Sequence, residues 1–217
     1  MEIDLLNNYP KSQRNLDARV SEKTNEIIKT ARKFGKDFFD GDRKFGYGGF
    51  TYSPKYWQIV VRDFISHYNL KENAKILDVG CAKGYMVYDF KRQFPKLNIF
   101  GIDISQYAID NCHPEVVENL QVGNCNNLQF EDNYFDLVIS INTVHNLELE
   151  DCVQSIKEIS RVSKGKSFIT VDAYNDDEEK KRMLKWNLTA KTILSTKNWK
   201  DLFKNIGYNG DYYWFIP

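Results

Sequence analysis

The chain of 217 residues has no excess of charge of either sign. Its 30 lysines and arginines are matched by 30 aspartates and glutamates. A protein that follows a nucleic-acid backbone needs clustered positive charge to offset the phosphates. The lysine-rich stretch at 29–36 is flanked by acids, so we expect no nucleic-acid partner.

Long apolar runs and a secretory leader are also missing. No run approaches the roughly 18 apolar residues of a membrane-spanning helix. Residues 1–15 contain no charged segment followed by an apolar core. We therefore expect a cytoplasmic protein with no membrane partner.

Cysteine is scarce, and its four copies do not form a C-x-x-C pair. Without that spacing we predict no metal site. Cys112 and Cys152 fall on the apolar stripes of predicted helices and are interpreted as small core residues. Cys81 and Cys125 lie in loops, where their backbone N–H groups matter more than their sulfurs. A reducing cytoplasm fits all four.

From Ala74 onward, segments typical of strands alternate with segments typical of helices. This alternation predicts an α/β fold with a mostly parallel sheet and helices on both faces. We expect about six strands, and the pairing of the last one does not follow from the pattern. The predicted strands are Lys75–Val79, Ile99–Ile102, Leu120–Val122, Leu137–Ile141, Ser167–Asp172 and Tyr212–Ile216.

Apolar residues spaced three and four apart predict helices around these strands. One covers Val20–Phe39 in the N-terminal extension, and Pro54 opens another that reaches Tyr68. Later helices cover Glu150–Val162 and the segment from Asp177 to Leu188. Thr196 is predicted to cap the last helix, which Gly207 ends.

The first predicted strand leads into a small-residue turn, in the sequence ILDVGCAKGY of residues 76–85. The strand carries Asp78, and the turn runs from Gly80 to Gly84. Glycine accepts backbone angles that a Cβ forbids and lets a ligand approach closely. The helix behind the turn presents unpaired N–H groups. The pattern predicts a nucleotide-type ligand at the carboxyl end of this strand.

Two common nucleotide motifs do not fit this turn. The dinucleotide motif Gly-x-Gly-x-x-Gly requires a third glycine where this chain has Met86, and no Gly-Lys-Ser/Thr follows for a phosphate loop. The acid two residues before the first glycine suits a ligand with a cationic amino group better than a pyrophosphate.

The turn resembles motif I of the class I S-adenosylmethionine-dependent methyltransferases, acid-x-Gly-x-Gly-x-Gly, with Ala82 in place of the middle glycine. Three further motifs of that family follow in order. IFGIDIS ends a second strand on Asp103, 25 residues after Asp78. VGNCNNLQF carries Asn124 where many members have an aspartate, and YFDLVISI forms the strand that lies beside the transferred methyl group.

The resemblance implies a Rossmann-like fold with S-adenosyl-L-methionine as cofactor and S-adenosyl-L-homocysteine as product. In this family the acid at Asp103 accepts hydrogen bonds from the ribose hydroxyls, and the Asn124 position meets the adenine amino group. The cofactor-binding residues expected from the motifs are Asp78, Gly80, Cys81, Ala82, Gly84, Asp103, Ile104, Asn124, Cys125, Ile141 and Asn142.

Methyl transfer to a hydroxyl or ammonium requires positioning and removal of a proton. Of three histidines, only His145 falls where the family places its reactive face. It is a candidate base, or else a histidine satisfied by loop backbone. Asp172 is a second candidate, or else a cap, and Tyr174 beside it is equally ambiguous. Asn146 is positioned to orient a substrate.

The segment from Arg43 to Tyr52 is rich in glycine and aromatic residues. It is either a lid over the acceptor or a plain surface turn. As a lid it offers Tyr47 for stacking and catalysis and Arg43 for an anionic group. We accordingly divide the chain into an extension with its lid, 1–52, and a methyltransferase domain, 53–217.

The predicted activity is transfer of a methyl group to O or N of a small polar metabolite, with a sugar or nucleotide-linked sugar as first candidate and an amino-acid-like metabolite as second. An RNA or protein substrate is an alternative, although no Asn-Pro-Pro-Tyr type sequence follows the fourth strand. A non-catalytic cofactor-binding subunit is another. We expect a monomer or homodimer.

Overall fold

The computed structural model describes residues 1–11, 20 and 23–217. Its helices are α2 (Asn25–Ala31), α3 (Lys36–Asp40), α4 (Pro54–Tyr68), α5 (Tyr85–Gln93), α6 (Gln106–Asp110), α7 (Leu149–Val162), α8 (Asp177–Trp186) and α9 (Thr196–Asn205), with short 3-10 turns η1 (Pro114–Asn119) and η2 (Val144–Asn146). Its strands are β1 (Lys75–Val79), β2 (Asn98–Asp103), β3 (Leu120–Val122), β4 (Leu137–Ile141), β5 (Ser167–Tyr174), β6 (Leu194–Ser195) and β7 (Asp211–Phe215).

Within the described ranges, seven strands form one parallel sheet in the order β3-β2-β1-β4-β5-β6, and β7 also pairs with β5. The prediction of a mostly parallel α/β sheet is confirmed. The strand order reverses at β1, because β2 and β3 lie on one side of it and β4 on the other. Ligands of such sheets bind in the crevice outside the carboxyl ends at this reversal.

The count of about six strands was one too low, because β6 is only two residues long and shows no alternation. The outer edge of β5 is shared: β7 pairs with Phe168–Asp172, and β6 pairs with Ala173 and Tyr174. The last strand therefore runs parallel to β5. Its far side is bridged by Glu2, which pairs with Tyr212.

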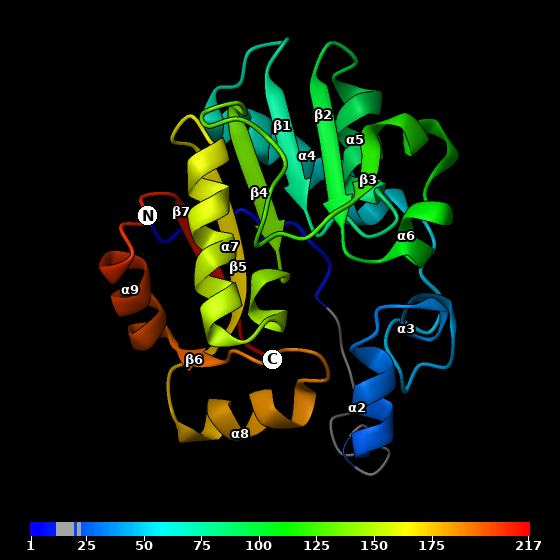
Figure 1. The fold of residues 1–217 in the computed structure, drawn as a ribbon, viewed down its shortest axis with the longest axis vertical. Helices are drawn as coiled ribbons and strands as arrows, with labels where there is room; N and C mark the ends of the chain where they lie inside the picture. Colours follow the sequence, from blue (N-terminus) through cyan, green and yellow to red (C-terminus); the bar gives the residue numbers. More distant parts are fainter. Residues whose placement is uncertain (12–19, 21–22) are drawn as a thin grey trace.

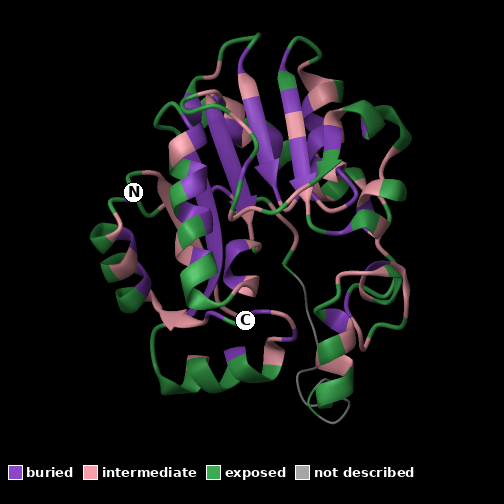
Figure 2. Ribbon diagram, viewed as in Figure 1, coloured by how far each residue is buried: buried purple, intermediate pink, exposed green. Residues whose placement is uncertain are grey.

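Two apolar layers hold the sheet because successive strand residues point to opposite faces. In β1, Ile76 packs with α4 and α5, whereas Leu77 packs with α7 and α9. Figure 1 shows α7 in front of the sheet and α4 behind it. Burial is concentrated in the strands, while α8 is mostly exposed (Figure 2).

Several helix boundaries differ from the prediction. The helix expected at Val20–Phe39 includes residues 21 and 22, which lie outside the described residues. The rest forms two short helices, since Phe34 has a φ of 49° and breaks the run. Ser195 and not Thr196 caps α9, through a bond from the Asn198 N–H to its hydroxyl. The glycine end at Gly207 is confirmed, with a φ of 72°.

The first helices lie beyond the carboxyl edge of the sheet, together with α8 (Figure 1). The carbonyl of Phe34 accepts a hydrogen bond from the Oγ of Ser105, which lies two residues after the end of β2. Arg32 of the extension bonds to the carbonyls of Thr189 and Ala190. The extension therefore spans this edge from the end of β2 to the segment after α8.

Candidate functional site

The turn after β1 requires glycine at its two ends. Gly80 has a φ of 86°, and a Cβ there would lie 2.0 Å from Thr143 Oγ1. Gly84 has a φ of 73°, and a Cβ there would lie 2.5 Å from Leu120 Cδ1. Both positions favour glycine, for conformation and for space. Ala82 adopts a φ of 50° in the same turn, a region that costs an alanine free energy.

The N–H groups of this turn bind the neighbouring strand. Those of Gly80 and Cys81 donate to the Ile102 carbonyl at 2.8 and 2.9 Å. The Ala82 N–H donates to Asp103 Oδ2 at 2.8 Å. These donors are already paired, so the turn is not a cradle of unpaired amides for a pyrophosphate. It fixes the position of the Asp103 carboxylate instead.

Two acids lie at the ends of adjacent strands. Asp78 is buried in β1, and burial and the nearby Asp103 carboxyl raise its pKa well above the usual range. Burial also raises the pKa of Asp103, although N–H bonds from Ser105 and Ala82 lower it. Each Asp103 oxygen accepts one N–H and retains a second lone pair for a hydroxyl. The free lone pairs of Asp103 suit a ligand that carries vicinal hydroxyls.

The residues predicted to meet an adenine lie on the same side of the crevice. Ile104 is 56% exposed directly after β2 and offers an apolar face. Asn124 is exposed, and its Oδ1 accepts the Asn126 N–H at 3.2 Å. Cys125 is partly buried, with its sulfur 3.3 Å from Ser155 Oγ. Together they form a rim with one apolar face and amide groups.

The end of β4 forms the other wall, with Ile141 partly buried there. Asn142 has a φ of 52°, and its Oδ1 accepts from Thr170 Oγ1 at 3.0 Å. Asn146 donates from Nδ2 to the Asn142 carbonyl, whereas its buried Oδ1 has no hydrogen-bond partner among the described residues. That oxygen can accept a hydrogen bond from a ligand if the amide reorients.

His145 is 3% exposed and lies against β5. Its Nδ1 accepts the backbone N–H of Asp172 at 2.8 Å, while the Asp172 carboxyl oxygen is 3.8 Å away. Burial lowers the pKa of His145, against the opposing effect of Asp172. The neutral ring therefore carries its proton on Nε2 and has no unused lone pair. Removing a proton would require His145 to exchange the Asp172 bond.

Asp172 lies inside β5 and not at its end, because the strand continues to Tyr174. It is 6% exposed, and burial raises its pKa although the nearby His145 lowers it. Tyr174 is partly buried, and the Lys180 ammonium lies 5.4 Å from its ring centroid. Asp172 and His145 are brought together, and Tyr174 stands apart from them at the strand end.

The glycine-rich segment 43–52 is held by hydrogen bonds within itself and by bonds to the turn after β1. Arg43 donates to the carbonyls of Gly46 and Tyr47 at 2.8 and 2.6 Å, so its guanidinium shapes the loop. Tyr47 stacks on Phe39 and is 42% exposed. The loop lies folded on aromatic neighbours, and the Tyr47 side chain stays partly exposed.

A buried lysine links this loop to the turn, and the sequence patterns did not reveal it. Lys83 Nζ contacts both carboxyl oxygens of Asp40, at 2.8 and 2.6 Å, and the Phe50 carbonyl at 3.1 Å. Tyr107 also donates to Asp40. A charged residue within a tight turn was the available signal, but nothing in the sequence indicated Asp40 as its partner.

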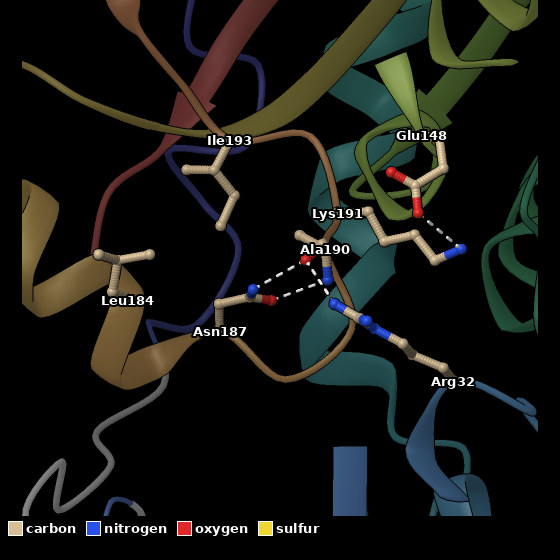
Figure 3. A pocket seen from close by; sticks show the side chains of 7 residues that line it. All are labelled: Arg32, Glu148, Leu184, Asn187, Ala190, Lys191 and Ile193. Atoms are coloured by element: carbon tan, nitrogen blue, oxygen red, sulfur yellow. Dashed lines mark hydrogen bonds and ion pairs between the residues drawn. The ribbon is translucent and has the colours of Figure 1, made fainter. Parts of the chain in front are cut away.

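An open cavity of about 440 Å³ lies between Arg32 of α2 and the segment after α8 (Figure 3). Lys191 and Glu148 also line it, and none of the three was predicted as a site residue. No helix within the described part of the chain is long and apolar enough to cross a membrane. Among the same residues, no group of three or more potential ligand side chains is placed to hold a metal ion.

Comparison with known proteins gives the domain its family. The methyltransferase domain family matches residues 77–171. A tRNA (carboxymethyluridine(34)-5-O)-methyltransferase of Arabidopsis thaliana is 31% identical over 129 residues, which are 58% of this chain and 30% of that protein. A sterol 24-C-methyltransferase of Aspergillus fumigatus is 27% identical over 180 residues, 73% of this chain and 47% of that protein.

The crystal structure of the YcgJ protein from Bacillus subtilis has a TM-score of 0.55 at 19% identity, over 66% of this chain and 65% of that one, and is similar in fold. The chain spans about half or less of the length of the curated relatives it matches first. The matched region contains the glycine turn, both acids and the end of β4. Over residues 77–171 the chain is therefore similar to the methyltransferase domain family, in agreement with the motifs that resemble those of the class I S-adenosylmethionine-dependent methyltransferases.

Proposed function

We propose that the protein transfers a methyl group from S-adenosyl-L-methionine to O or N of a small polar metabolite. The observation that carries this proposal is the Asp103 carboxylate, held at the end of β2 by the Ala82 and Ser105 N–H groups. Its free lone pairs can accept hydrogen bonds from the two ribose hydroxyls of the cofactor. The buried Asp78 carboxyl lies beside it at the end of the neighbouring strand β1.

The residues of the crevice fit this cofactor in three parts. The turn with Asp78, Gly80, Cys81, Ala82 and Gly84 suits the methionine portion, because it carries no side chain at Gly80 or Gly84, where even a Cβ would clash with its neighbours. Ile104, Asn124 and Cys125 suit the adenine. Ile141 and Asn142 would lie beside the methyl group. The bound cofactor would supply a methyl group activated by a positive sulfur, and the chain would supply its position.

The acceptor is proposed to be a sugar or nucleotide-linked sugar, or else another small polar metabolite. Tyr47 offers an exposed aromatic face, and the buried Oδ1 of Asn146 offers an acceptor close to β4. Arg43 and Tyr174 complete the residues proposed to contact it. The named acceptors of the relatives, a sterol and a tRNA uridine, differ so widely that family membership leaves this choice open.

For proton removal we propose His145, with Asp172 and Tyr47 as further candidates. The substitution His145→Asn places an oxygen where Nδ1 accepts the Asp172 N–H, yet it supplies no base. Unchanged affinity for S-adenosylhomocysteine with turnover reduced by about 10²–10⁴-fold would support a general base. Full turnover would leave His145 a structural residue that holds η2 against β5.

The deciding experiment is calorimetric titration with S-adenosylhomocysteine, with NAD in parallel. Micromolar binding of the former alone supports the proposal, and a screen of sugar, amino-acid and RNA acceptors with labelled methyl donor follows. Binding without transfer to any acceptor would favour a non-catalytic subunit. Absence of binding would mean that Ala82 and Asn124 mark an altered site. The division at residue 52 is proposed on the same basis, with 1–52 as extension and lid.

A further inference from the structure

The cavity between α2 and α8 has charged groups on one side and apolar groups on the other. Figure 3 shows Arg32, Lys191 and Glu148 together, and Leu184 and Ile193 across from them. A volume of about 440 Å³ is within the usual range for small-molecule sites. The cavity therefore suits a small molecule with a carbon skeleton and a polar head.

Its charged side carries a net positive charge. Lys191 Nζ lies 3.3 Å from Glu148 Oε1, so these two charges offset each other. Arg32 donates from Nε and Nη2 to two backbone carbonyls, both at 3.2 Å. No carboxylate in the described ranges lies within ion-pair distance of Arg32. A guanidinium has five N–H donors in a fork that matches a carboxylate or phosphate.

The cavity is joined to the proposed reaction centre through the backbone. The N–H groups of Lys191 and Thr192 donate to the His145 carbonyl at 2.9 and 3.0 Å. Glu148 follows His145 by three residues, just after η2. The segment that lines the cavity therefore contacts the backbone of η2, which follows β4. The cavity is therefore placed to hold the part of an acceptor that does not react.

We propose that this cavity binds the acidic group of the methyl acceptor, a carboxylate or phosphate, with Arg32 and Lys191 as the residues that select it. This inference rests on the proposed function, since it assigns the acceptor of that same site. Leu184 and Ile193 then contact the carbon skeleton. Loss of the acidic group from an acceptor removes the charge-assisted hydrogen bonds and leaves only these apolar contacts.

The test is an NMR titration of the full chain with inorganic phosphate and, separately, with succinate. At least one anion should bind saturably, and Arg32→Gln should weaken it by about tenfold. Lys191→Gln is a second variant that should weaken it as well. Lys33→Gln is the matched control, because it removes the same charge one residue away from an exposed position outside the cavity.

The two anions distinguish the source of the acidic group, since a preference for phosphate or for succinate identifies which is recognised. Equal weakening by Lys33→Gln and Arg32→Gln, or no saturable binding of either anion, would overturn the inference. S-adenosylhomocysteine should bind all variants with equal affinity. If S-adenosylhomocysteine does not bind the wild-type protein, the proposed function itself is wrong. This outcome is distinct from a failure of anion binding, which would contradict only the further inference.

Discussion

The crevice has a cofactor side, formed by the strand ends, and a lid side, formed by the N-terminal extension and the segment after α8. The two sides differ in how far apart along the chain their contacting residues lie. On the cofactor side, Ala82 and Asp103 are 21 residues apart, the length of one helix and one strand. On the lid side, Arg32 contacts Ala190 from 158 residues away, and Lys83 contacts Asp40 across 43. The first kind of contact lies within one βαβ unit, whereas the second kind depends on how distant parts of the chain pack together.

We therefore expect the first kind of contact to be common to related methyltransferases and the second kind to be particular to this chain. The cofactor side is built from consecutive strand ends, so its geometry follows from local motifs. The lid side is built from the extension and the segment after α8. There Arg32 contacts backbone carbonyls, which any residue possesses, and Lys83 contacts the carboxylate of Asp40. Acceptor recognition is therefore expected to depend on the lid side, and cofactor recognition on the strand ends.

The largest loss of stability on the cofactor side is expected from the substitution Gly80→Val. The new Cβ would overlap Thr143 Oγ1, and the φ of 86° is strained for a branched residue. Unfolding free energy should fall by about 4 kcal/mol, measured by urea denaturation. Gly165→Val is the control, since its φ is 99° but nothing lies within 4 Å of an added Cβ. Equal losses would show that only backbone conformation matters at Gly80.

The link between the two sides is tested by Asp40→Asn. Burial alone would raise the pKa of Asp40, but bonds from Lys83 and Tyr107 outweigh it and hold the pKa below the usual value of an aspartate. Such a carboxyl stabilises the fold above that pH and loses the contribution as pH falls through the lowered value. The variant should lose about 2 kcal/mol at neutral pH, and the difference from wild type should vanish in acid.

The control for that variant is Asp42→Asn in the same loop, whose partner Lys44 lies 3.5 Å away at the surface. Its unfolding free energy should stay close to that of the wild type, because an exposed ion pair contributes little to stability. A pH-independent loss in Asp40→Asn would mean that shape and not charge holds the lid. Loss of S-adenosylhomocysteine affinity in Asp40→Asn alone would show that the lid also positions the turn.

The ribose assignment is tested by Asp103→Ala. The change removes the acceptor of two backbone N–H groups and of the two proposed ribose hydroxyls. Affinity for S-adenosylhomocysteine should fall tenfold or more, measured by calorimetry on protein shown to be folded by circular dichroism. Asp201→Ala, an exposed acid of α9, should leave affinity unchanged. A wild-type affinity in Asp103→Ala would rule out the ribose role.

The same division explains which parts of the fold were predictable. The parallel sheet followed from the alternation of strand and helix segments, and the position of Asp103 at the end of β2 followed from the acid that closes an apolar run. β6 was missed because two residues carry no periodicity. Ser195 and Thr196 are adjacent hydroxyl residues, and local propensity does not choose between them as a cap. Arg32 was missed because its contacts are to backbone carbonyls across the molecule.

The smallest change in unfolding free energy is expected from Ala82→Gly, which is also the most specific test of the cofactor side. Relief of the strain at a φ of 50° is partly offset by the backbone entropy of glycine, so the fold should gain about 0.5 kcal/mol. Asn69→Gly is the control, because Asn69 has a φ of 45° at the end of α4, away from the crevice. If both variants gain stability but only Ala82→Gly alters S-adenosylhomocysteine affinity, the alanine methyl group contacts the cofactor. If affinity is unchanged in both, the alanine costs only conformational free energy, and the crevice accommodates it.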